Sequence, residues 1–390
     1  MSAADVVVIG GGCTGASTAF WLASQYQQRV VLLEQRTVAG GPTGRSSGIV
    51  RMHYSYEALI RLALRGREIF AHFEEVVGGS ADFTQTGFVI VVPPGQEATL
   101  AANVALQRRL GVATSLLDSR ALQEIAPRLR TDDVGGGAYE PDSGYADGYA
   151  TATGFAAAAR RWGADVREST RGVRVLVEGS RVTGVDTPAG RIPAGAVLVA
   201  AGPWTREMLA PLGVDVPIRT TRHQVVLLEL PEGAASLGPV LVDMGLGFYT
   251  RPDVGGQFLA GSVEEGPDEE VDADAFNEGL DFAFAERMSR RLAHRIPAFA
   301  DVGVKGGYAS LYDVTPDWQP ILGAVPGVDG LYIAAGFSGH GFKLSPAVGE
   351  ALAGLIATGR FDTVDLGLFR LSRFAEGALI HSPYAHGIAG

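Results

Sequence analysis

The sequence predicts an α/β protein whose N-terminal part is a nucleotide-binding β-α-β unit, and three observations predict it. An apolar run, Val6–Ile9, precedes three glycines with the spacing G-x-G-x-x-G. The next stretch, "TGASTAFWLASQY", has helical spacing and a helix-forming composition, and a second apolar run, Val30–Leu33, follows it. Short apolar runs on either side of a helix are typical of buried parallel strands. This order of elements is that of a Rossmann-type fold.

The residues of this unit that we predict to bind a dinucleotide are Gly10, Gly12, Cys13, Thr14, Gly15 and Glu34. The three glycines serve the turn, the close approach of a pyrophosphate and the packing of the helix on the strand. We expect the phosphates at the positive N-terminus of the helix. Glu34 ends the second strand, where its carboxylate can accept hydrogen bonds from a ribose diol. Cys13 is interpreted as a small packing residue rather than a nucleophile.

Length and composition exclude several classes of protein. A chain of 390 residues suits one large or two interleaved domains. The formal charge of −11 argues against nucleic acid and anionic membranes as partners. Cys13 is the single cysteine, which excludes an internal disulfide, and the histidines are scattered without ligand spacing, so we expect no metal site.

The same composition indicates a compartment. The N-terminal residues lack the basic segment and cleavage site of a signal peptide. No apolar run approaches the roughly 18 residues needed to span a bilayer. Together with the single cysteine, these features predict a cytoplasmic protein in a reducing environment.

Later segments extend the cofactor-binding pattern. Residues 40–55, "GGPTGRSSGIVRMHYS", combine small residues with two arginines, as expected for a backbone that wraps an anion and then a planar group. Two further apolar runs, at 196–205 and 330–342, end in glycine turns. Both ends of the chain therefore have features of cofactor-binding structure. The alternative is a nicotinamide dehydrogenase, in which a contiguous Rossmann half precedes a separate catalytic domain.

Five segments together resemble the flavin-dependent D-amino acid oxidase and sarcosine oxidase superfamily, also called glycine oxidase-like. They are "VVVIGGGCTGASTAFWLA", "TGRSSGIVRMHYS", "DSGYADGYATATGFAAAARRWGADV", "VLVAAGPWT" and "TPDWQPILGAVPGVDGLYIAAGFSGHGFKLSPAVGEALAGLI". The last is most similar to monomeric sarcosine oxidases, and "IVRMHYS" is also similar to the β subunit of heterotetrameric sarcosine oxidase.

The resemblance implies a discontinuous FAD-binding domain interleaved with an antiparallel-sheet substrate domain. The expected FAD-binding pieces are 1–80, 145–210 and 305–390, and the substrate-binding pieces are 81–144 and 211–304. We expect three strands of the substrate sheet in "GFVIVVPP", "RHQVVLLEL" and "GQFLAGS".

Lys343 is one of only two lysines in the chain, the other being Lys305. In the family that this chain resembles, the lysine after "GHGF" and an arginine bind the carboxylate of an amino-acid substrate, and Lys343 and Arg51 match these positions. The chemistry supports this, because a carboxylate taken from water into an apolar pocket needs a cationic, hydrogen-bonding partner. The alternative for each is a solvated surface charge.

The resemblance implies further site residues. Tyr249 matches an active-site tyrosine, and His53 and Tyr54 are candidates to line the substrate face or to pack in the core. The remaining residues that we expect to contact the cofactor are Arg45, Ser46, Ser47, Gly202, Gly336, Gly339, His340, Gly341, Phe342 and Lys343. Arg45 is expected either to hold phosphate or to flank the ring, and His340 has a main-chain or a catalytic role.

A helix is predicted to begin beside the cofactor. Ser345 is the expected N-cap, Pro346 the first helical residue and Gly359 the C-terminal stop. The partial positive charge at such a helix N-terminus favours an anionic reduced flavin.

The chain departs from the monomeric sarcosine oxidases at two positions. Ser310 is nearest to the position of the cysteine that attaches FAD in those enzymes, so the cofactor is expected to be non-covalent FAD. Leu259 or a neighbour occupies the place of a lysine that promotes reaction with oxygen, so the electron acceptor is oxygen or another acceptor.

The resemblance implies oxidation of an amino-acid C–N bond to an imine by hydride transfer to flavin N5, followed by hydrolysis. Sarcosine, another N-methyl amino acid or proline is the first choice of substrate, and a D-amino acid or glycine is the second. A different possibility is a flavoprotein subunit of a multi-subunit dehydrogenase, which passes electrons to a partner subunit. No catalytic carboxylate or histidine dyad stands out in the motifs, consistent with catalysis by positioning.

Overall fold

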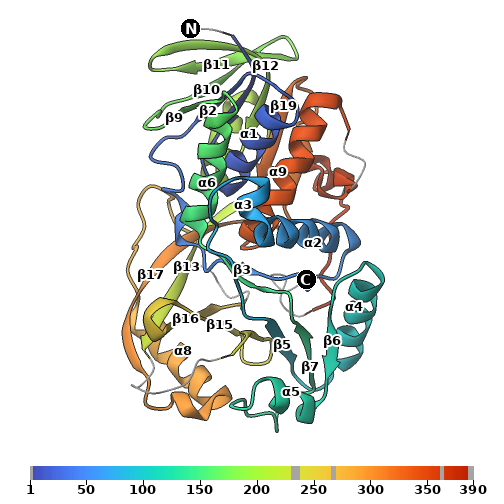
Figure 1. Cartoon of the computed structure of the whole chain (residues 1–390). Coiled ribbons are helices and arrows are strands. Elements are labelled where there is room, and N and C mark those ends of the chain that lie inside the picture. Colours follow the sequence, from blue (N-terminus) through green and yellow to red (C-terminus); the bar gives the residue numbers. More distant parts are fainter. Residues whose placement is uncertain (1–2, 230–237, 265–268, 361–363, 385–390) are drawn as a thin grey trace.

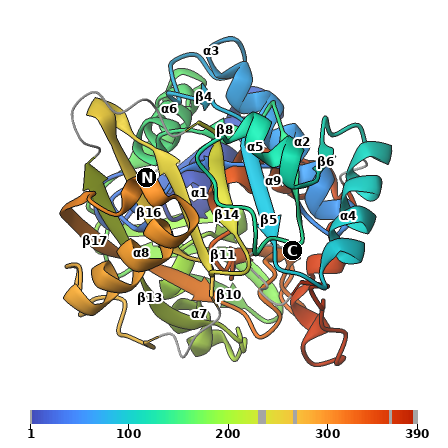
Figure 2. The same ribbon diagram turned by 90° about the horizontal axis from the view of Figure 1, so that it is seen from below.

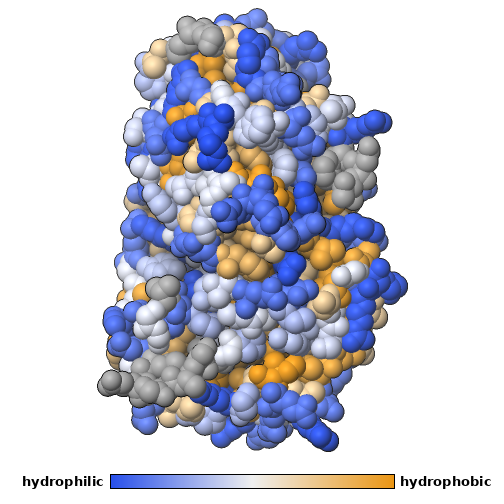
Figure 3. All heavy atoms as spheres, viewed as in Figure 1, coloured by the Kyte–Doolittle hydropathy of each residue, from blue (hydrophilic) through white to orange (hydrophobic). Residues whose placement is uncertain are grey.

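The computed structural model describes residues 3–229, 238–264, 269–360 and 364–384. The molecule is elongated and has two halves, each built on a large β-sheet (Figure 1). Polar side chains cover most of the face shown in Figure 3, and apolar ones form small separate groups. In the described part of the chain, every helix is too short or too polar to cross a lipid bilayer.

The parallel strands of the first sheet position the glycine loop. β1 (Ala4–Ile9) lies between β2 (Val30–Leu33) and β12 (Gly190–Val199), and β9 (Asp165–Arg167) and β19 (Leu331–Ala335) continue the sheet on either side. All of these neighbouring strands are parallel. Alternate residues of β1 enter two different apolar cores, one on each face of the sheet. Because both faces are buried, the strand is a continuous apolar run.

Antiparallel strands and helices complete this half. The strands are β10 (Arg174–Glu178), β11 (Arg181–Thr187) and β18 (Ile321–Ala324). Three helices share the apolar core on one face: α1 (Cys13–Ser24), α6 (Gly148–Arg161) and α9 (Gly341–Thr358). A fourth, α2 (Glu57–Ala71), packs against α9 (Figure 1).

The second sheet has eight strands in the order β17-β13-β16-β15-β14-β5-β7-β6. Their bounds are Gly303–Val314, Arg219–Glu229, Gln257–Ser262, Phe248–Pro252, Val240–Asp243, Phe88–Val92, Gly136–Glu140 and Ser115–Leu117. Helices α5 (Ser119–Ile125) and α8 (Phe282–Arg295) share an apolar core on one face (Figure 2), and α4 (Glu97–Arg109) packs near the β6 end.

The three strands predicted for this sheet are confirmed as β5, β13 and β16. Leu230, at the end of the second predicted segment, lies outside the described residues. The expectation of a wholly antiparallel sheet was wrong at one pair, since β5 and β14 are parallel. These two strands come from separate segments of the chain, so no hairpin turn fixes their relative direction.

β17 crosses the expected domain boundary. Most of it falls in the range 305–390, which the sequence assigned to the FAD-binding part, yet it pairs with β13 along its length in the second sheet. It is 12 residues long, and its C-terminal residues run on from the second sheet to the wall of the cofactor cavity described below. β17 therefore connects the two halves, and the domain division stays a prediction.

Helix α9 begins earlier than the sequence predicts. It starts at Gly341 with His340 at the N-cap position, and Pro346 lies inside it, so the assignment of Ser345 as N-cap was wrong. A proline has no N–H to donate to the carbonyl oxygen four residues before it, which here belongs to Phe342. The Ser345 hydroxyl donates to that same oxygen at 2.8 Å and so replaces the missing bond. The C-terminal stop at Gly359 is confirmed, with φ of 80°.

A small three-stranded sheet lies between the two halves (Figure 1). Its strands are β3 (Ile49–Val50), β8 (Gly144–Tyr145) and β4 (Thr84–Gln85). Since Arg51 follows β3 directly, this sheet carries it to the boundary between the halves. In the first half, the short helix α3 (Phe73–Val76) packs against α2, and the short helix α7 (Thr205–Leu209) packs near β10.

Candidate active site

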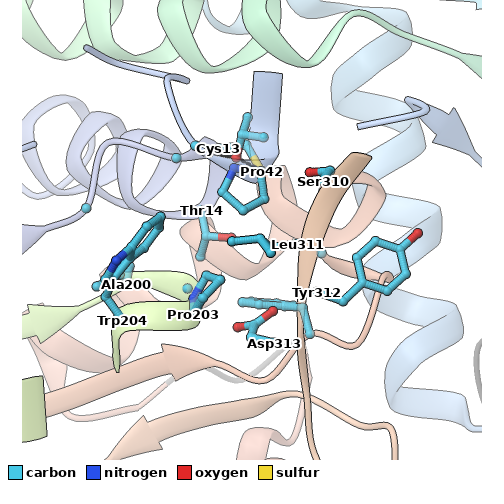
Figure 4. A pocket seen from close by; sticks show the side chains of 18 of the residues that line it. Cys13, Thr14, Pro42, Ala200, Pro203, Trp204, Ser310, Leu311, Tyr312 and Asp313 are labelled. Atoms are coloured by element: carbon cyan, nitrogen blue, oxygen red, sulfur yellow. Dashed lines mark hydrogen bonds between the residues drawn. The ribbon is translucent and has the colours of Figure 1, made fainter. Parts of the chain in front are cut away.

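A cavity of about 440 Å³ lies where the two halves meet. Its walls include the carboxyl ends of β1, β2 and β12, the loop before β3, and parts of β13 and β17. Figure 4 shows Cys13 and Thr14 at one wall, Pro203 and Trp204 at another, and Ser310 to Asp313 of β17 opposite. In an open parallel sheet, ligands bind in the crevice outside the carboxyl ends of the strands.

The glycine loop gives this cavity an anion-binding wall. Gly10 adopts φ of +112°. A Cβ on Gly15 would lie 2.0 Å from the Gly10 carbonyl oxygen, so α1 can pack this closely on β1 only with glycine there. The N-cap residue of α1 is Gly12, which has no side chain to cap the first turn. Backbone N–H groups at a helix N-terminus bind phosphate well.

The part of the cavity next to the glycine loop also suits a nucleoside. The Glu34 carboxylate is held by the Gly11 N–H at 2.7 Å and by the Arg36 N–H at 2.8 Å. Carboxylate oxygens accept more than one hydrogen bond each, so capacity remains for a ribose diol. The indole N–H of Trp204 is buried at this cavity and has no hydrogen-bond partner among the described residues. A glycine cradle, a fixed carboxylate and an unpartnered donor fit a dinucleotide with a pyrophosphate bridge.

The predicted cofactor-binding residues that line this cavity are Gly10, Gly12, Cys13, Thr14, Glu34, Arg45, Ser46, Ser47, Gly202, Gly339, Gly341 and Phe342. Gly15, Gly336, His340 and Lys343 do not line it. Arg45 lies at the rim, where its Nη2 pairs with Glu278 at 2.7 Å and its side chain is partly exposed. The roles of all these residues stay predictions.

A second cavity, of about 50 Å³, adjoins the first. The two share the residues Ser46, Ser47, Tyr249, Tyr312, Gly339 and Phe342. Arg51 and Lys343 line only the smaller one, and they are 6% and 7% exposed. A small compartment with two cations thus opens beside the larger cavity.

The two cations are held differently. The Arg51 guanidinium lies 4.4 Å from the centroid of the Tyr54 ring and donates from Nη1 to the His53 carbonyl oxygen. Lys343 stands in the first turn of α9, and no carboxylate of the described residues pairs with it. Burial, and then the charge of Arg51, hold the pKa of the Lys343 ammonium well below its ordinary 10.5. An anion bound between them would reverse this effect.

His53, Tyr54 and His340 do not line either cavity, so the structure favours packing over lining of the substrate face for the first two. The His53 ring bonds to the Tyr384 hydroxyl at 2.8 Å, and burial together with Arg51 lowers its pKa to about 3. Tyr54 stacks on His340 with ring centroids 5.6 Å apart. Both imidazoles are fully buried and neutral, because burial also lowers the pKa of His340. His53, Tyr54 and His340 therefore form a group of buried polar side chains next to Arg51.

Tyr249 lies on the wall that the two cavities share. On the paired strand β16, a Cβ on Gly261 would lie 2.4 Å from the Tyr249 hydroxyl oxygen, so glycine there makes room for the ring. Burial raises the pKa of Tyr249, while a hydrogen bond with Ser47 and the charge of Arg251 oppose the rise. The phenol is therefore protonated at neutral pH.

Several lining residues were missed by the sequence reasoning. Tyr312 lines both cavities, and its ring stacks on His223 with centroids 3.7 Å apart. A signal existed, because side chains two apart on a strand share a face, and Ser310 was already assigned to this site. Ser310 indeed lines the larger cavity, opposite His223 in the strand pairing.

The smaller cavity also has an aliphatic wall, which no sequence motif predicted. It consists of Ile49, Ile90, Val242 and Val263. Val242 and Ile90 are directly paired on the parallel strands β14 and β5. Leu259 is 2% exposed and packs in the same apolar cluster as these residues. Among the described residues, no group of three or more histidine, cysteine or acidic side chains is arranged to hold a metal ion; His386 lies outside them.

The chain is similar to known flavoproteins. Residues 5–355 match the family described as FAD dependent oxidoreductase. The chain is 29% identical over 377 residues to 4-methylaminobutanoate oxidase (formaldehyde-forming) of Paenarthrobacter nicotinovorans, covering 94% of this chain and 45% of that protein. It is 26% identical to sarcosine oxidase subunit beta of Rhodobacter capsulatus, covering 99% of this chain and 92% of that protein.

A solved structure is also similar. L-proline dehydrogenase from P. horikoshii superposes with a TM-score of 0.89 at 30% identity, over 97% of this chain and 100% of that one. The alternative of a contiguous nicotinamide dehydrogenase is excluded, because the first sheet draws strands from both ends and the middle of the chain. The match over residues 5–355 and the dinucleotide cradle agree, and the chain therefore belongs to the FAD-dependent oxidoreductase family.

Proposed function

We propose that this protein oxidises the C–N bond of a small α-amino acid with a secondary amine, such as sarcosine, another N-methyl amino acid or proline. The product is an imine, which water hydrolyses. One observation carries the proposal: Arg51 and Lys343 line a small cavity that shares a wall with the cofactor cavity. Bound FAD supplies the acceptor for the hydride that leaves the substrate carbon.

The two cations are suited to a carboxylate. A buried charge is stable only when it is paired and hydrogen-bonded. A substrate carboxylate would supply the missing charge for Lys343 and accept charge-assisted hydrogen bonds from both side chains. Fixing the carboxylate also fixes the position of the α-carbon beside the shared wall, where Tyr249 and Phe342 lie.

The same charges imply that the amine binds without its extra proton. No acidic side chain is among the described residues that line the smaller cavity, so an ammonium group has no counter-ion there. Arg51 and Lys343 disfavour a third positive charge nearby. A neutral nitrogen keeps its lone pair, which forms the C=N bond of an iminium ion as the hydride departs; loss of the N–H proton to water then gives the imine. No residue has to remove a proton from carbon in this scheme.

The aliphatic wall limits what else the substrate carries. Ile90 and Val242 offer no hydrogen-bonding group to a polar substituent, and leaving one unpaired in such a wall costs about 1–3 kcal/mol. The volume of about 50 Å³ favours a methyl group or a compact ring over a long side chain. The similar proteins support this choice, since their names include proline, sarcosine and 4-methylaminobutanoate, which are all carboxylates with a secondary amine.

Anaerobic mixing of the purified holoprotein with a panel of amines tests the proposal. We expect sarcosine, other N-methyl amino acids or proline to bleach the visible flavin absorbance, with D-amino acids and glycine slower. Bleaching by primary D-amino acids or glycine alone would favour the second substrate class. Bleaching by none of these compounds would refute oxidation of small amino acids.

A role as the flavin subunit of a larger dehydrogenase is the second candidate. By resemblance, Leu259 or a neighbour takes the place of the lysine that promotes reaction with oxygen in monomeric sarcosine oxidases, and one similar protein is named as a subunit. Activity with a dye in place of oxygen, together with copurification of a second chain, would favour it. Stoichiometric peroxide from the isolated chain would contradict it. The single cysteine supports a reducing, cytoplasmic setting for either role.

A further inference from the structure

Asp313 is a carboxylate near the C-terminal end of β17 that lines the cofactor cavity and is only 8% exposed. Its Oδ2 accepts a hydrogen bond from the Gly336 N–H at 2.7 Å, and its carbonyl oxygen accepts one from the Ser338 N–H at 3.0 Å. Asp313 is therefore tied to the turn that leads into α9. Neither the glycine motifs nor the carboxylate-binding cations account for an acidic group at this wall.

The neighbours of Asp313 locate it along the cavity. The ring end of the cofactor belongs beside the smaller cavity, and Tyr312, directly before Asp313, is one of the residues that the two cavities share. The phosphate end belongs at the glycine loop and Thr14. Thr14, Pro203 and Leu311 line the same cavity, and in the view of Figure 4 the Asp313 side chain lies below them and to the left of the Tyr312 ring. In FAD, a polyhydroxylated ribityl chain joins the ring to the pyrophosphate, and bound FAD would bring this chain to the stretch between these two ends.

The chemistry of a carboxylate selects among the parts of FAD. Burial raises the pKa of Asp313 to about 6, although the N–H groups of Gly336, Asp313 and Phe337 oppose the rise. A mostly ionised carboxylate repels phosphate and needs hydrogen-bond donors. Hydroxyl groups are the donors that the middle of FAD offers, and Glu34 is the residue predicted to accept from the ribose diol.

We propose that the Asp313 carboxylate binds FAD by accepting a hydrogen bond from a hydroxyl of its ribityl chain, and thereby connects the cofactor to the turn at Gly336. The inference rests on the proposed position of the flavin ring beside the smaller cavity, and it is independent of which amine is oxidised. The competing explanation is that Asp313 only stabilises the turn and affects FAD indirectly.

A thermodynamic cycle separates these explanations. The dissociation constant is measured by flavin fluorescence for full-length apoprotein with FAD and with FAD analogues that lack the 2′, 3′ or 4′ ribityl hydroxyl. The variants are Asp313→Ala, Asp313→Asn and Ser338→Ala. Ser338 is the matched control, because its hydroxyl accepts from the Thr315 N–H at 3.2 Å and supports the same turn without lining the cavity.

We expect the wild type to bind one of the three analogues at least about tenfold more weakly than FAD, as for a charge-assisted hydrogen bond. Asp313→Ala should bind FAD about tenfold more weakly than the wild type does. This variant should bind the analogue without that hydroxyl as well as it binds FAD. Ser338→Ala should weaken all four ligands by one common factor.

Asp313→Asn keeps an oxygen for the Gly336 N–H, so the same cycle can be closed if the alanine variant does not fold. In Asp313→Asn, removing that hydroxyl from FAD should weaken binding by a smaller factor than it does in the wild type. The contrary outcome is that, in either variant, removing each of the three hydroxyls weakens binding by the same factor as in the wild type. The effects of the mutation and of the missing hydroxyl would then be independent, which would overturn the proposal and leave Asp313 as a support of the turn.

Discussion

Arg51 and Lys343 line the same small cavity, Arg51 from the end of β3 and Lys343 from the first turn of α9. Both are more than nine-tenths buried, and the described residues that line this cavity include no acidic side chain. Two like charges placed together in a poorly solvated site are unfavourable without an anion. The carboxylate of the proposed substrate would supply this anion.

Arg51→Lys tests the geometry of the arginine. The guanidinium lies over the Tyr54 ring and donates to the His53 carbonyl oxygen, which orients its planar fork. A compact ammonium keeps the charge but cannot reproduce these contacts together with a two-point bond to carboxylate. We expect the Kd of a carboxylate substrate analogue to rise about tenfold, roughly 1.4 kcal/mol, with FAD still bound. Unchanged affinity would show that the planar guanidinium of Arg51 does not make a two-point bond to the carboxylate.

The pH dependence should identify Lys343. Its pKa is held well below the ordinary 10.5 by burial and by Arg51, and only the charged form binds carboxylate. Affinity is therefore complete below this pKa and is lost as the pH rises through it, whereas deprotonation of the substrate amine helps as the pH rises. We expect a bell-shaped profile of kcat/KM against pH. In Lys343→Met the alkaline limb should vanish; a limb that persists unchanged would assign it to another group.

Val242→Ala tests the aliphatic wall. Removing the two methyl groups weakens contact with the small substrate by about 1 kcal/mol and opens space for a larger one. The kcat/KM ratio of a six-membered to a five-membered cyclic amino acid should rise at least about fivefold. Val240→Ala is the matched control, since Val240 is also buried on β14 but does not line the cavity. Equal ratios in the two variants would remove Val242 from substrate recognition.

Arg373→Met tests a buried ion pair that supports the turn beside the cofactor. The Arg373 guanidinium bonds to both oxygens of Asp317 at 2.8 and 2.9 Å, and both side chains are 0% exposed. Leaving Asp317 charged and buried without this partner should lower the free energy of unfolding in urea by about 3–5 kcal/mol.

Arg120→Met is the control for that measurement. Arg120 pairs with Glu124 on an exposed helix surface, and such a pair contributes about 0–1 kcal/mol. If the two variants lost the same small amount, the buried pair would not be important for stability.

The sequence predicted those parts of the fold that depend on neighbouring residues. The unit from β1 to β2 follows from apolar runs and glycine spacing within some thirty residues, because its packing is local. The predicted start of α9 was wrong because it also used only neighbouring residues. A proline near a helix start is usually the first helical residue, so Ser345 was taken as the N-cap. Here the Ser345 hydroxyl lets Pro346 stand deeper in the helix.

The site depended on long-range order that composition and spacing do not contain. Arg51 and Lys343 were predicted only through resemblance, since nothing in their local sequences brings them together. The aliphatic wall comes from β3, β5, β14 and the end of β16, so its members become neighbours only once the strand order is known. Asp313 escaped notice because its partner, the Gly336 N–H, is a backbone group.

Lys343→Met offers the most direct test of the carboxylate site. Methionine keeps much of the apolar stem and removes the charge, so FAD should stay bound and the fold should persist. The Kd of sarcosine or proline, measured by perturbation of the flavin spectrum under anaerobic conditions, should rise by about 1.5–3 kcal/mol, which is at least tenfold. The affinity of a matched amine without a carboxylate should change little. Equal losses for the two ligands would contradict a carboxylate-binding role and leave Lys343 as a charge that acts on the flavin site as a whole.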